Sequence, residues 1–158
     1  MIVADAGPLI GLAKIDRLAL LKQLAREVAV PAPVWHEVVV RGGDRPEVER
    51  IVRELGGSIL EPEPAVFAAY HLQIDAGEAA ALAVAALHPG ALLLMDDARG
   101  RRLAQAQGFS CLGTLGLLVR AKRLGLVAAV EPEIRALVSA GIYLSDAIVR
   151  QVLLAAGE

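Results

Sequence analysis

The chain is poor in several residues on which common kinds of protein depend. Among its 158 residues there is a single cysteine, Cys111, so no disulfide can form within the chain, and no Cys/His spacing typical of a zinc site occurs. The apolar neighbours of Cys111 favour a packing role over reactivity. The start of the sequence has no signal-peptide pattern either, so we expect a reducing, cytoplasmic setting.

Aromatic side chains and excess charge are also scarce. Aromatic residues make up 3% of the chain, so base stacking is not expected to dominate a contact with nucleic acid. The net charge of −2 offers a polyanion no general attraction, and a nucleic-acid contact would need a local basic patch and a metal ion. Hydrophobic residues make up 56% and charged residues 22%, a composition typical of a compact globular chain.

Long apolar runs are interrupted before they reach membrane-spanning length. The uncharged stretches 79–95 and 103–119 approach the roughly 17–25 residues that a membrane helix requires. His88-Pro89-Gly90 breaks the first stretch, and three glycines break the second. Each stretch is better explained as a helix followed by a strand, and no membrane segment is expected.

Short apolar runs alternate with helical patterns along the chain. Strands are expected at residues 1–5, 27–30, 58–61, 91–95 and 109–111. Helices are expected at 8–14, 18–24, 33–41, 45–55, 76–87, 99–107, 114–124, 131–140 and 145–155, with caps at Asp16, Asp44, Asp75 and Thr114, while Pro62 and Pro64 mark a loop. We therefore expect a single α/β domain over 1–158. It would be a three-layer α/β/α sandwich with a central, mainly parallel sheet and a helical C-terminal tail from about 131.

Acidic residues stand where several of these strands end or where the next helix starts. Asp5 closes the first strand, Glu37 lies early in the helix after the second, Glu78 opens the most apolar helix, and Asp96-Asp97 follow the strand at 91–95. The carboxyl ends of parallel strands share one edge of a sheet, and ligands bind in the crevice there. Carboxylates gathered at that edge repel one another unless a cation joins them, and oxygen ligands suit Mg²⁺ or Mn²⁺. The pattern predicts a metal-dependent site that cleaves phosphodiester bonds.

Several of these acids also have a simpler interpretation. Asp5 could cap the first helix, and Glu37 could occupy a solvated position on an amphipathic helix. Glu78 follows Asp75 at the spacing of a capping box, in which the Glu78 carboxylate would reach back to the Asp75 N–H. His36 could bind a transition metal, although a lone histidine is more often structural.

Asp96 and Asp97 are the most informative of the acids. Two adjacent carboxylates after an apolar strand repel each other, and a helix cap would require only one of them. Successive strand residues point to opposite sides, so one of the pair is expected to face the metal. We expect Asp97 to be that ligand and Asp96 to assist it or to accept a hydrogen bond.

A basic segment follows the acidic pair. Arg99, Arg101 and Arg102 form either a solvated helix face or contacts for the phosphates of a substrate, because the planar guanidinium group matches phosphate oxygens. Thr114 is assigned with them to substrate binding. The Gly-Thr-Leu-Gly sequence at 113–116 is too weak a pattern to predict a phosphate-binding loop by itself.

Taken in order, five motifs resemble those of the PIN-domain family of ribonucleases, and especially a prokaryotic branch related to the toxins of toxin–antitoxin pairs. The motifs are Asp5-Ala6-Gly7-Pro8-Leu9-Ile10, Pro33-Val34-Trp35-His36-Glu37-Val38, Asp75-Ala76-Gly77-Glu78-Ala79, Leu94-Met95-Asp96-Asp97-Ala98-Arg99-Gly100-Arg101 and Gly113-Thr114-Leu115-Gly116. The resemblance covers nearly the whole chain. It implies a three-layer α/β/α fold and a Mg²⁺- or Mn²⁺-dependent endoribonuclease whose metal-binding acids are Asp5, Glu37, Glu78 and Asp97, with Asp96 beside them.

The resemblance also implies partners, namely an RNA substrate and a small antitoxin protein, and the surplus of apolar residues suggests a homodimer. Two positions depart from the family pattern, because Ala6 and Met95 stand where many relatives have Ser or Thr. A PIN fold that binds metal or protein without cleaving RNA is therefore the alternative. A phosphoryl-transfer enzyme with Asp5 as nucleophile is less consistent with the sequence, which lacks the Asp-x-Asp arrangement expected after the first strand.

Overall fold

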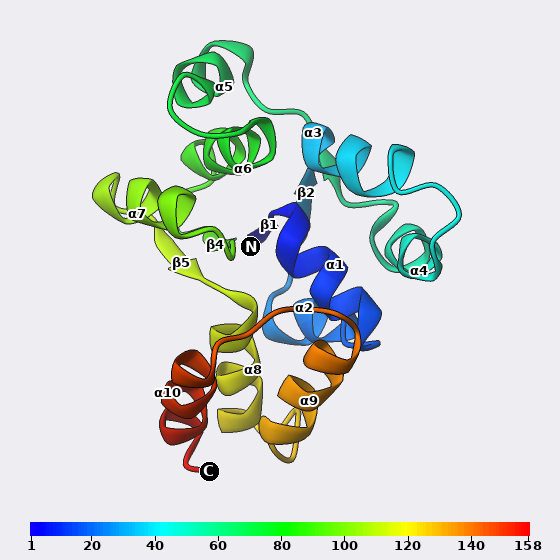
Figure 1. The fold of residues 1–158 in the computed structure, drawn as a ribbon. Coiled ribbons are helices and arrows are strands. Elements are labelled where there is room, and N and C mark those ends of the chain that lie inside the picture. The colour runs from blue at the N-terminus through cyan, green and yellow to red at the C-terminus, as the bar shows by residue number, and fades with distance from the viewer.

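The computed structural model describes residues 1–158 and contains one five-stranded sheet (Figure 1). The strands are β1 (Ile2–Ala4), β2 (Val28–Pro31), β3 (Ile59–Leu60), β4 (Leu92–Leu94) and β5 (Ser110–Leu112). Their order across the sheet is β3-β2-β1-β4-β5, and every neighbouring pair is parallel. The expected parallel sheet is confirmed, and each predicted strand lies within one residue of its expected ends.

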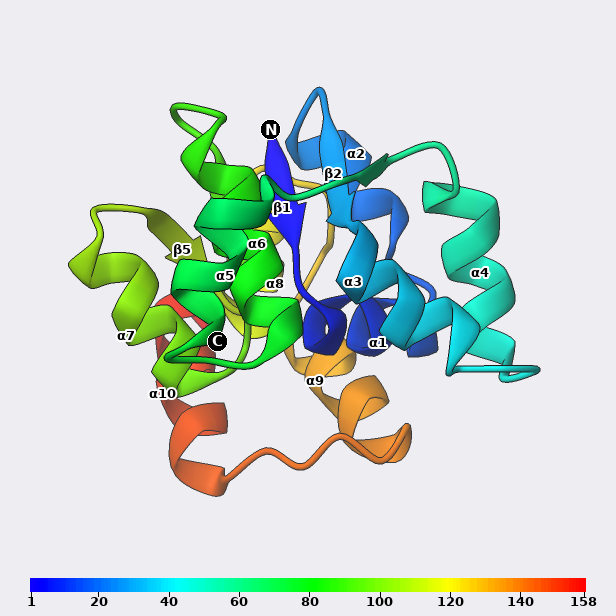
Figure 2. The ribbon, with the colours of Figure 1, turned by 90° about the horizontal axis from the view of Figure 1, so that it is seen from above.

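Helices fill the connections between the strands, as parallel pairing requires, and three more helices follow β5. They are α1 (Ala6–Lys14), α2 (Ala19–Leu24), α3 (Ala32–Trp35), the π-helical turn η1 (His36–Val40), α4 (Pro46–Leu55), α5 (Pro64–His71), α6 (Ala76–Ala86), α7 (Ala98–Ala106), α8 (Thr114–Arg123), α9 (Glu131–Ser139) and α10 (Asp146–Ala156). Figure 2 shows α4 and α7 on opposite sides of the molecule, with the strands between them. None of the helices has the length and hydropathy that crossing a membrane requires.

Successive residues of the central strands face two separate hydrophobic cores. Val3 and Leu93 point to the side covered by α5, α6 and α7, and they belong to the same buried cluster as Leu82 of α6. Ile2 and Leu94 point to the opposite side, which is covered chiefly by α1, α2 and α8. Figure 1 shows these two groups of helices on either side of the strands. The sheet is therefore covered on both faces, and the expected α/β/α sandwich is confirmed.

The direction in which the sheet grows changes beside β1. The chain places β1, β2 and β3 outwards to one edge and then returns to place β4 and β5 on the other side of β1. A crevice opens at the carboxyl ends of the two strands that flank such a switch point. Asp5 directly follows β1, and its backbone N–H donates to the carbonyl oxygen of Leu94, the last residue of β4, over 2.9 Å. The acids that follow β1 and β4 therefore lie at the same crevice.

The loop predicted at Pro62 and Pro64 was wrong in part, because α5 begins at Pro64. Proline fits the first position of a helix, where its missing N–H would have had no partner in any case. The helix start is further stabilised by Glu63, whose carboxylate accepts a hydrogen bond from the Val66 N–H over 2.8 Å. Proline at this place therefore starts a helix instead of preventing one.

Three predicted caps were also wrong. Asp16 lies in the left-handed region, with a φ of 57°, and α2 begins only after Leu18. Helix α4 begins one residue too late for Asp44 to cap it. The cap of α8 is Gly113, and the Thr114 hydroxyl bonds elsewhere. In all three cases the helix starts one or more residues away from where the polar residue would cap it.

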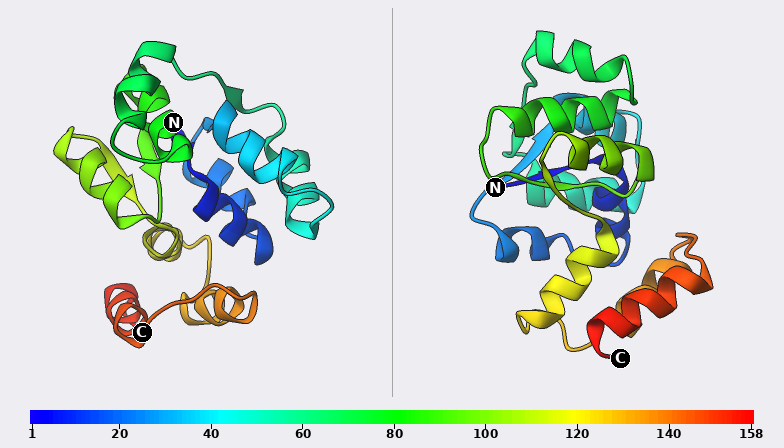
Figure 3. Two further views of the ribbon diagram at one scale, coloured as in Figure 1. Left: turned by 45° about the horizontal axis from the view of Figure 1, so that its top comes forward. Right: turned by 90° about the vertical axis from the view of Figure 1, so that its left-hand side faces the viewer.

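The last two helices, α9 and α10, lie at the end of the molecule away from α5 (Figures 1 and 3). Helix α10 packs against α8, where Lys122 Nζ donates to the Ala156 carbonyl and to Glu158 Oε1, each over 2.8 Å. Glu158 also accepts hydrogen bonds from the backbone N–H groups of Val130 and Glu131, over 2.7 and 2.9 Å. The Glu158 carboxylate thereby ties the end of α10 to α8 and to the start of α9.

Candidate functional site

Asp5 is a buried carboxylate at the crevice between β1 and β4, with only 8% of its surface exposed. It occupies the cap position of α1, as its simpler interpretation predicts, but its side chain accepts no capping hydrogen bond. Burial is the main cause that raises the pKa of Asp5 to about 7, the carboxylates of Asp75, Glu37 and Asp96 contribute to the rise, and a hydrogen bond from the Ala6 N–H opposes it. Asp5 therefore lies among acids and forms no salt bridge.

Three carboxylate oxygens surround Gly77 in the first turn of α6. A Cβ atom at this position would lie 3.0 Å from Asp5 Oδ1, 3.4 Å from Glu37 Oε2 and 3.6 Å from Asp75 Oδ1. Glycine, which has no side chain, lets the three acids approach the backbone of the helix closely. The structure therefore brings together Asp5 and Glu37, which were both expected at the site, and adds Asp75 to them.

Asp75 is the acid that the sequence did not assign to the site. It caps α6 as predicted, because its Oδ1 accepts a hydrogen bond from the Glu78 N–H over 2.9 Å. Its negative charge also raises the pKa of both Asp5 and Glu78. The sequence pattern Asp75-x-x-Glu78 signals a helix start, and only the placement of that start at the crevice makes the cap an acid of the site.

Glu78 is almost completely buried, with 4% of its surface exposed. Burial, followed by the charges of Asp75 and Asp97, raises the pKa of Glu78 to about 7. Its side chain does not complete the capping box with Asp75. A Cβ atom on Gly100 of α7 would lie 2.9 Å from Glu78 Oε1, so glycine at that position leaves room for the carboxylate between α6 and α7.

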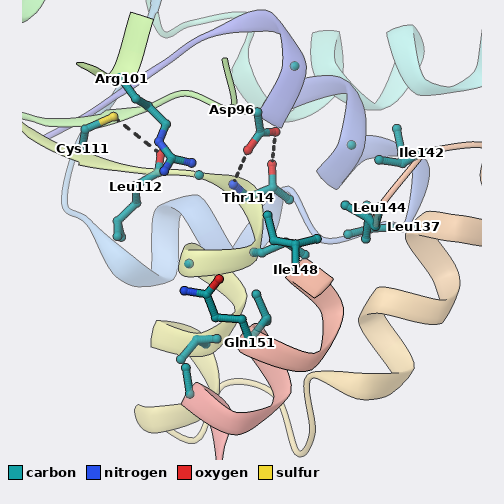
Figure 4. Close-up of a pocket in the computed structure, with 18 of the residues that line it drawn as sticks. Asp96, Arg101, Cys111, Leu112, Thr114, Leu137, Ile142, Leu144, Ile148 and Gln151 are labelled. Carbon is teal, nitrogen blue, oxygen red and sulfur yellow. Dashed lines mark hydrogen bonds between the residues drawn. The ribbon is translucent and has the colours of Figure 1, made fainter. Parts of the chain in front are cut away.

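The adjacent residues Asp96 and Asp97 belong to different halves of the site. Asp96 accepts hydrogen bonds from the Thr114 N–H over 2.7 Å and from Thr114 Oγ1 over 2.6 Å (Figure 4), and it contributes to the raised pKa of Asp5. Asp97 Oδ1 accepts from the N–H groups of Arg99 and Gly100 and caps α7, which lowers the pKa of Asp97. Asp96 therefore lies towards Asp5, whereas Asp97 lies towards Glu78.

The three arginines that follow the pair lie at the start of α7. Arg99 and Arg102 are exposed, and Arg101 is half-buried, with its Nη1 3.2 Å from where a Cβ atom of Gly113 would lie. None of the three forms an ion pair within the chain. Their charges are therefore available to an anion beside the acids.

Thr114 is buried, with 5% of its surface exposed. Its backbone N–H and its hydroxyl both donate to the Asp96 carboxylate, so Asp96 is held from two directions (Figure 4). In this geometry Thr114 positions an acid of the site.

The acids gather at the crevice without closing around one point. No group of three or more acidic, histidine or cysteine side chains is arranged as a ready metal site. The donor set still fits a hard divalent cation, because every donor is a carboxylate oxygen and the neighbouring acids help to raise the pKa of Asp5 and Glu78. A cation at the crevice would offset that mutual repulsion.

Comparison with known proteins gives one family. A family model described as a PIN domain matches residues 1–158. Neither the curated proteins nor the solved structures contain a significant match.

Proposed function

We propose that this chain, which belongs to the PIN-domain family over residues 1–158, is a Mg²⁺- or Mn²⁺-dependent endoribonuclease that hydrolyses RNA phosphodiester bonds. Proteins of this family are generally nucleases. The observation that carries the proposal is the gathering of acids at the switch point of the sheet, where Asp5 follows β1 and Asp96 follows β4. Ligands of open α/β sheets bind at this position.

The acids of the crevice are proposed to bind the divalent ion together. Asp5, Glu37, Glu78 and Asp97 are the proposed metal-binding and catalytic residues, with Asp96 as a further ligand. When bound, Mg²⁺ or Mn²⁺ lowers the pKa of a water molecule and stabilises negative charge on phosphate oxygens. Thr114 keeps the Asp96 carboxylate in place through its two hydrogen bonds.

The substrate phosphates are proposed to lie along the start of α7. Arg99, Arg101 and Arg102 form no ion pair in the chain, and a guanidinium group binds phosphate oxygens through two parallel hydrogen bonds. Thr114 was expected to contact the substrate as well, but both of its donors are used on Asp96, so its proposed contribution is indirect.

The test is RNA cleavage measured beside thermal melting for the wild type and for Asp5→Asn, with and without Mn²⁺. We expect Mn²⁺ to raise the melting temperature of the wild type and to support cleavage, and we expect Asp5→Asn to lose both effects. Wild-type activity in Asp5→Asn would contradict the proposal. Stabilisation by Mn²⁺ without cleavage of any RNA would favour a PIN fold that binds metal or protein without cleaving, an alternative supported by Ala6 and Met95, which stand where many relatives have Ser or Thr.

We further propose that the protein acts in the cytoplasm as the toxin of a toxin–antitoxin pair, restrained by a small antitoxin, and that it forms a homodimer. Support comes from large apolar side chains that remain exposed, among them Leu72 at 88%, Leu124 at 61% and Leu87 at 57%. Exposed apolar surface is often covered by a protein partner. Light scattering of the purified protein, alone and after co-expression with its neighbouring gene, tests both assemblies.

A further inference from the structure

A cavity of about 740 Å³ lies directly beside Asp96, between α8, α10 and the segment 140–145 that joins α9 to α10. Asp96, Thr114 and Arg101 form the end of the cavity that is nearest to the acids of the site (Figure 4). Much of the remaining wall is apolar and consists of Leu112, Leu115, Leu137, Ile142, Leu144 and Ile148. We call this space the α8–α10 cavity. An apolar cavity with a few polar groups is the usual form of a ligand site, and holding a metal ion does not require one.

The polar groups of the α8–α10 cavity are few. Arg101 forms no ion pair within the chain and lies beside Asp96, because both side chains reach the position that a Cβ atom of Gly113 would occupy. Gln151 of α10 lines the cavity and offers an amide that can both donate and accept hydrogen bonds (Figure 4). Tyr143 also lines the cavity, yet 88% of its surface is exposed, so its ring is open to a ligand.

We propose that the α8–α10 cavity receives the base of an unpaired nucleotide next to the scissile phosphate of the RNA. This rests on the proposed function, because it takes that phosphate to lie at the acids. The cavity begins at Asp96, so a nucleotide held there has an apolar space within reach of its base. Unpaired RNA bases stack on aromatic side chains and present their edges to hydrogen-bonding groups. Tyr143 supplies the ring, Gln151 the edge contact and Arg101 a contact to the adjoining phosphate.

A base in a duplex is stacked and paired, and it can enter a side-chain cavity only after it has left the stack at a cost of a few kcal/mol. An apolar peptide would also match the wall of the cavity. The unpaired Arg101 and the position of Asp96 in the cavity wall favour the nucleotide, because both suit a ligand that carries a phosphate next to a flat apolar group.

Binding of a labelled single-stranded RNA oligonucleotide containing all four bases tests the proposal, with the duplex of the same sequence as the comparison. All affinities are measured in Mg²⁺ buffer on full-length Asp5→Asn protein, so that the probe stays intact. Tyr143→Ala removes the ring, and Tyr143→Phe keeps it. Ile148→Trp fills the cavity, and its matched control Leu154→Trp places the same side chain on the same helix at an exposed position outside the cavity.

We expect the single strand to bind more tightly than the duplex, and we expect Tyr143→Ala and Ile148→Trp each to weaken its binding about tenfold, the usual effect of losing one stacked base. Tyr143→Phe and Leu154→Trp should bind as tightly as their parent. Because Tyr143 is exposed, its replacement tests the proposal even where Ile148→Trp disturbs the packing of α10.

Equal affinity of all variants for the single strand would overturn the cavity assignment. If protein with Asp5 intact still cleaved RNA in a Mn²⁺-dependent way in that case, the proposed nuclease function would stand without the cavity assignment. Loss of a dimer in Ile148→Trp at unchanged RNA affinity would also overturn the assignment and would make a second copy of the chain the occupant. Absence of both RNA binding and cleavage would overturn the two proposals together.

Discussion

Carboxylates at the crevice and carboxylates in the C-terminal helices have opposite surroundings in the same chain. In the C-terminal helices, Glu158 accepts hydrogen bonds from Lys122 and from two backbone N–H groups, which lower the pKa of Glu158 to about 2. Glu133 accepts two hydrogen bonds from Arg17, each over 2.9 Å. At the crevice, burial and neighbouring acids raise the pKa of Asp5 and of Glu78 to about 7.

The difference lies in the partners of the acids. Acids of the C-terminal helices are joined to cations and N–H groups of the chain, so they hold helices together. Asp5 and Glu78 are buried beside other acids and form no salt bridge, an arrangement that lowers the stability of the folded chain. A cluster of this kind is suited to a cation from solution, which is the physical basis of the proposed metal dependence.

The largest expected effect comes from neutralising one acid in each region. Glu78→Gln should reduce Mn²⁺-dependent RNA cleavage by at least about 100-fold and should raise the melting temperature of the metal-free protein, because a buried charge is removed. Glu158→Gln should leave cleavage unchanged and lower the melting temperature, because the bond to Lys122 is weakened. Cleavage rates and melting curves on both variants measure the contrast. A Glu78→Gln protein that melts at a lower temperature than the wild type and still cleaves RNA would contradict this contrast.

The dependence of stability on pH should separate the two regions next. Asp5 and Glu78 have ordinary pKa values of 3.8 and 4.5 and folded values of about 7, so the folded protein holds more protons between these limits and stability falls as pH rises from about 4 to about 7. Glu158 acts with the opposite sign, because its contribution is present above 4.5 and is lost as pH falls towards 2.

Metal-free protein should therefore melt at its highest temperature at about pH 4, where these opposing contributions balance. The Asp5→Asn variant should show a smaller loss between about pH 5 and pH 8, and Mn²⁺ should stabilise the wild type increasingly over the same range, because the metal binds the deprotonated acids. Calorimetry at several pH values measures these curves. A wild-type melting temperature that rises steadily from pH 5 to pH 8 without metal would contradict the assignment of repelling acids at the crevice.

A smaller effect is expected from the ion pair between Glu133 and Arg17. Glu133→Ala should destabilise the folded protein by about 2 kcal/mol, because Glu133 is buried and both of its hydrogen bonds to Arg17 are lost. Glu131→Ala is the matched control on α9, since its bond to Arg135 is exposed and such pairs contribute at most about 0.5 kcal/mol. Denaturant unfolding of both variants measures the difference, and equal losses would show that burial of the pair has no influence.

The smallest expected effect concerns the placement of Asp96. Thr114→Val removes the hydroxyl that donates to Asp96 Oδ2 but retains the N–H bond and the volume of the side chain, so cleavage should fall about tenfold with the fold unchanged. Thr114→Ser keeps the hydroxyl and should restore most of the activity. If Thr114→Ser were as slow as Thr114→Val, the hydroxyl would not be what positions Asp96.

Local patterns in the sequence predicted much of the fold. Alternating apolar strands and helices gave all five strands in place, because strand residues such as Val3 and Leu93 have to be apolar to face a core. Helix starts were predicted less well. Pro64 begins a helix, and Asp16 and Thr114 cap none, because a cap depends on backbone angles that several nearby polar residues can compete to satisfy.

The sequence by itself determined that acids stand at strand ends and helix starts, because the periodicity that predicts a strand or a helix depends only on residues that are close in sequence. Only the tertiary structure decided which residues each of those acids contacts. Asp96 turns to Thr114 and Asp5, Asp97 caps α7 beside Glu78, and Asp75 joins the crevice through α6. These partners lie far apart in sequence. They meet because the reversal of strand order places β1 beside β4, and that order depends on how the helices pack against both faces of the sheet.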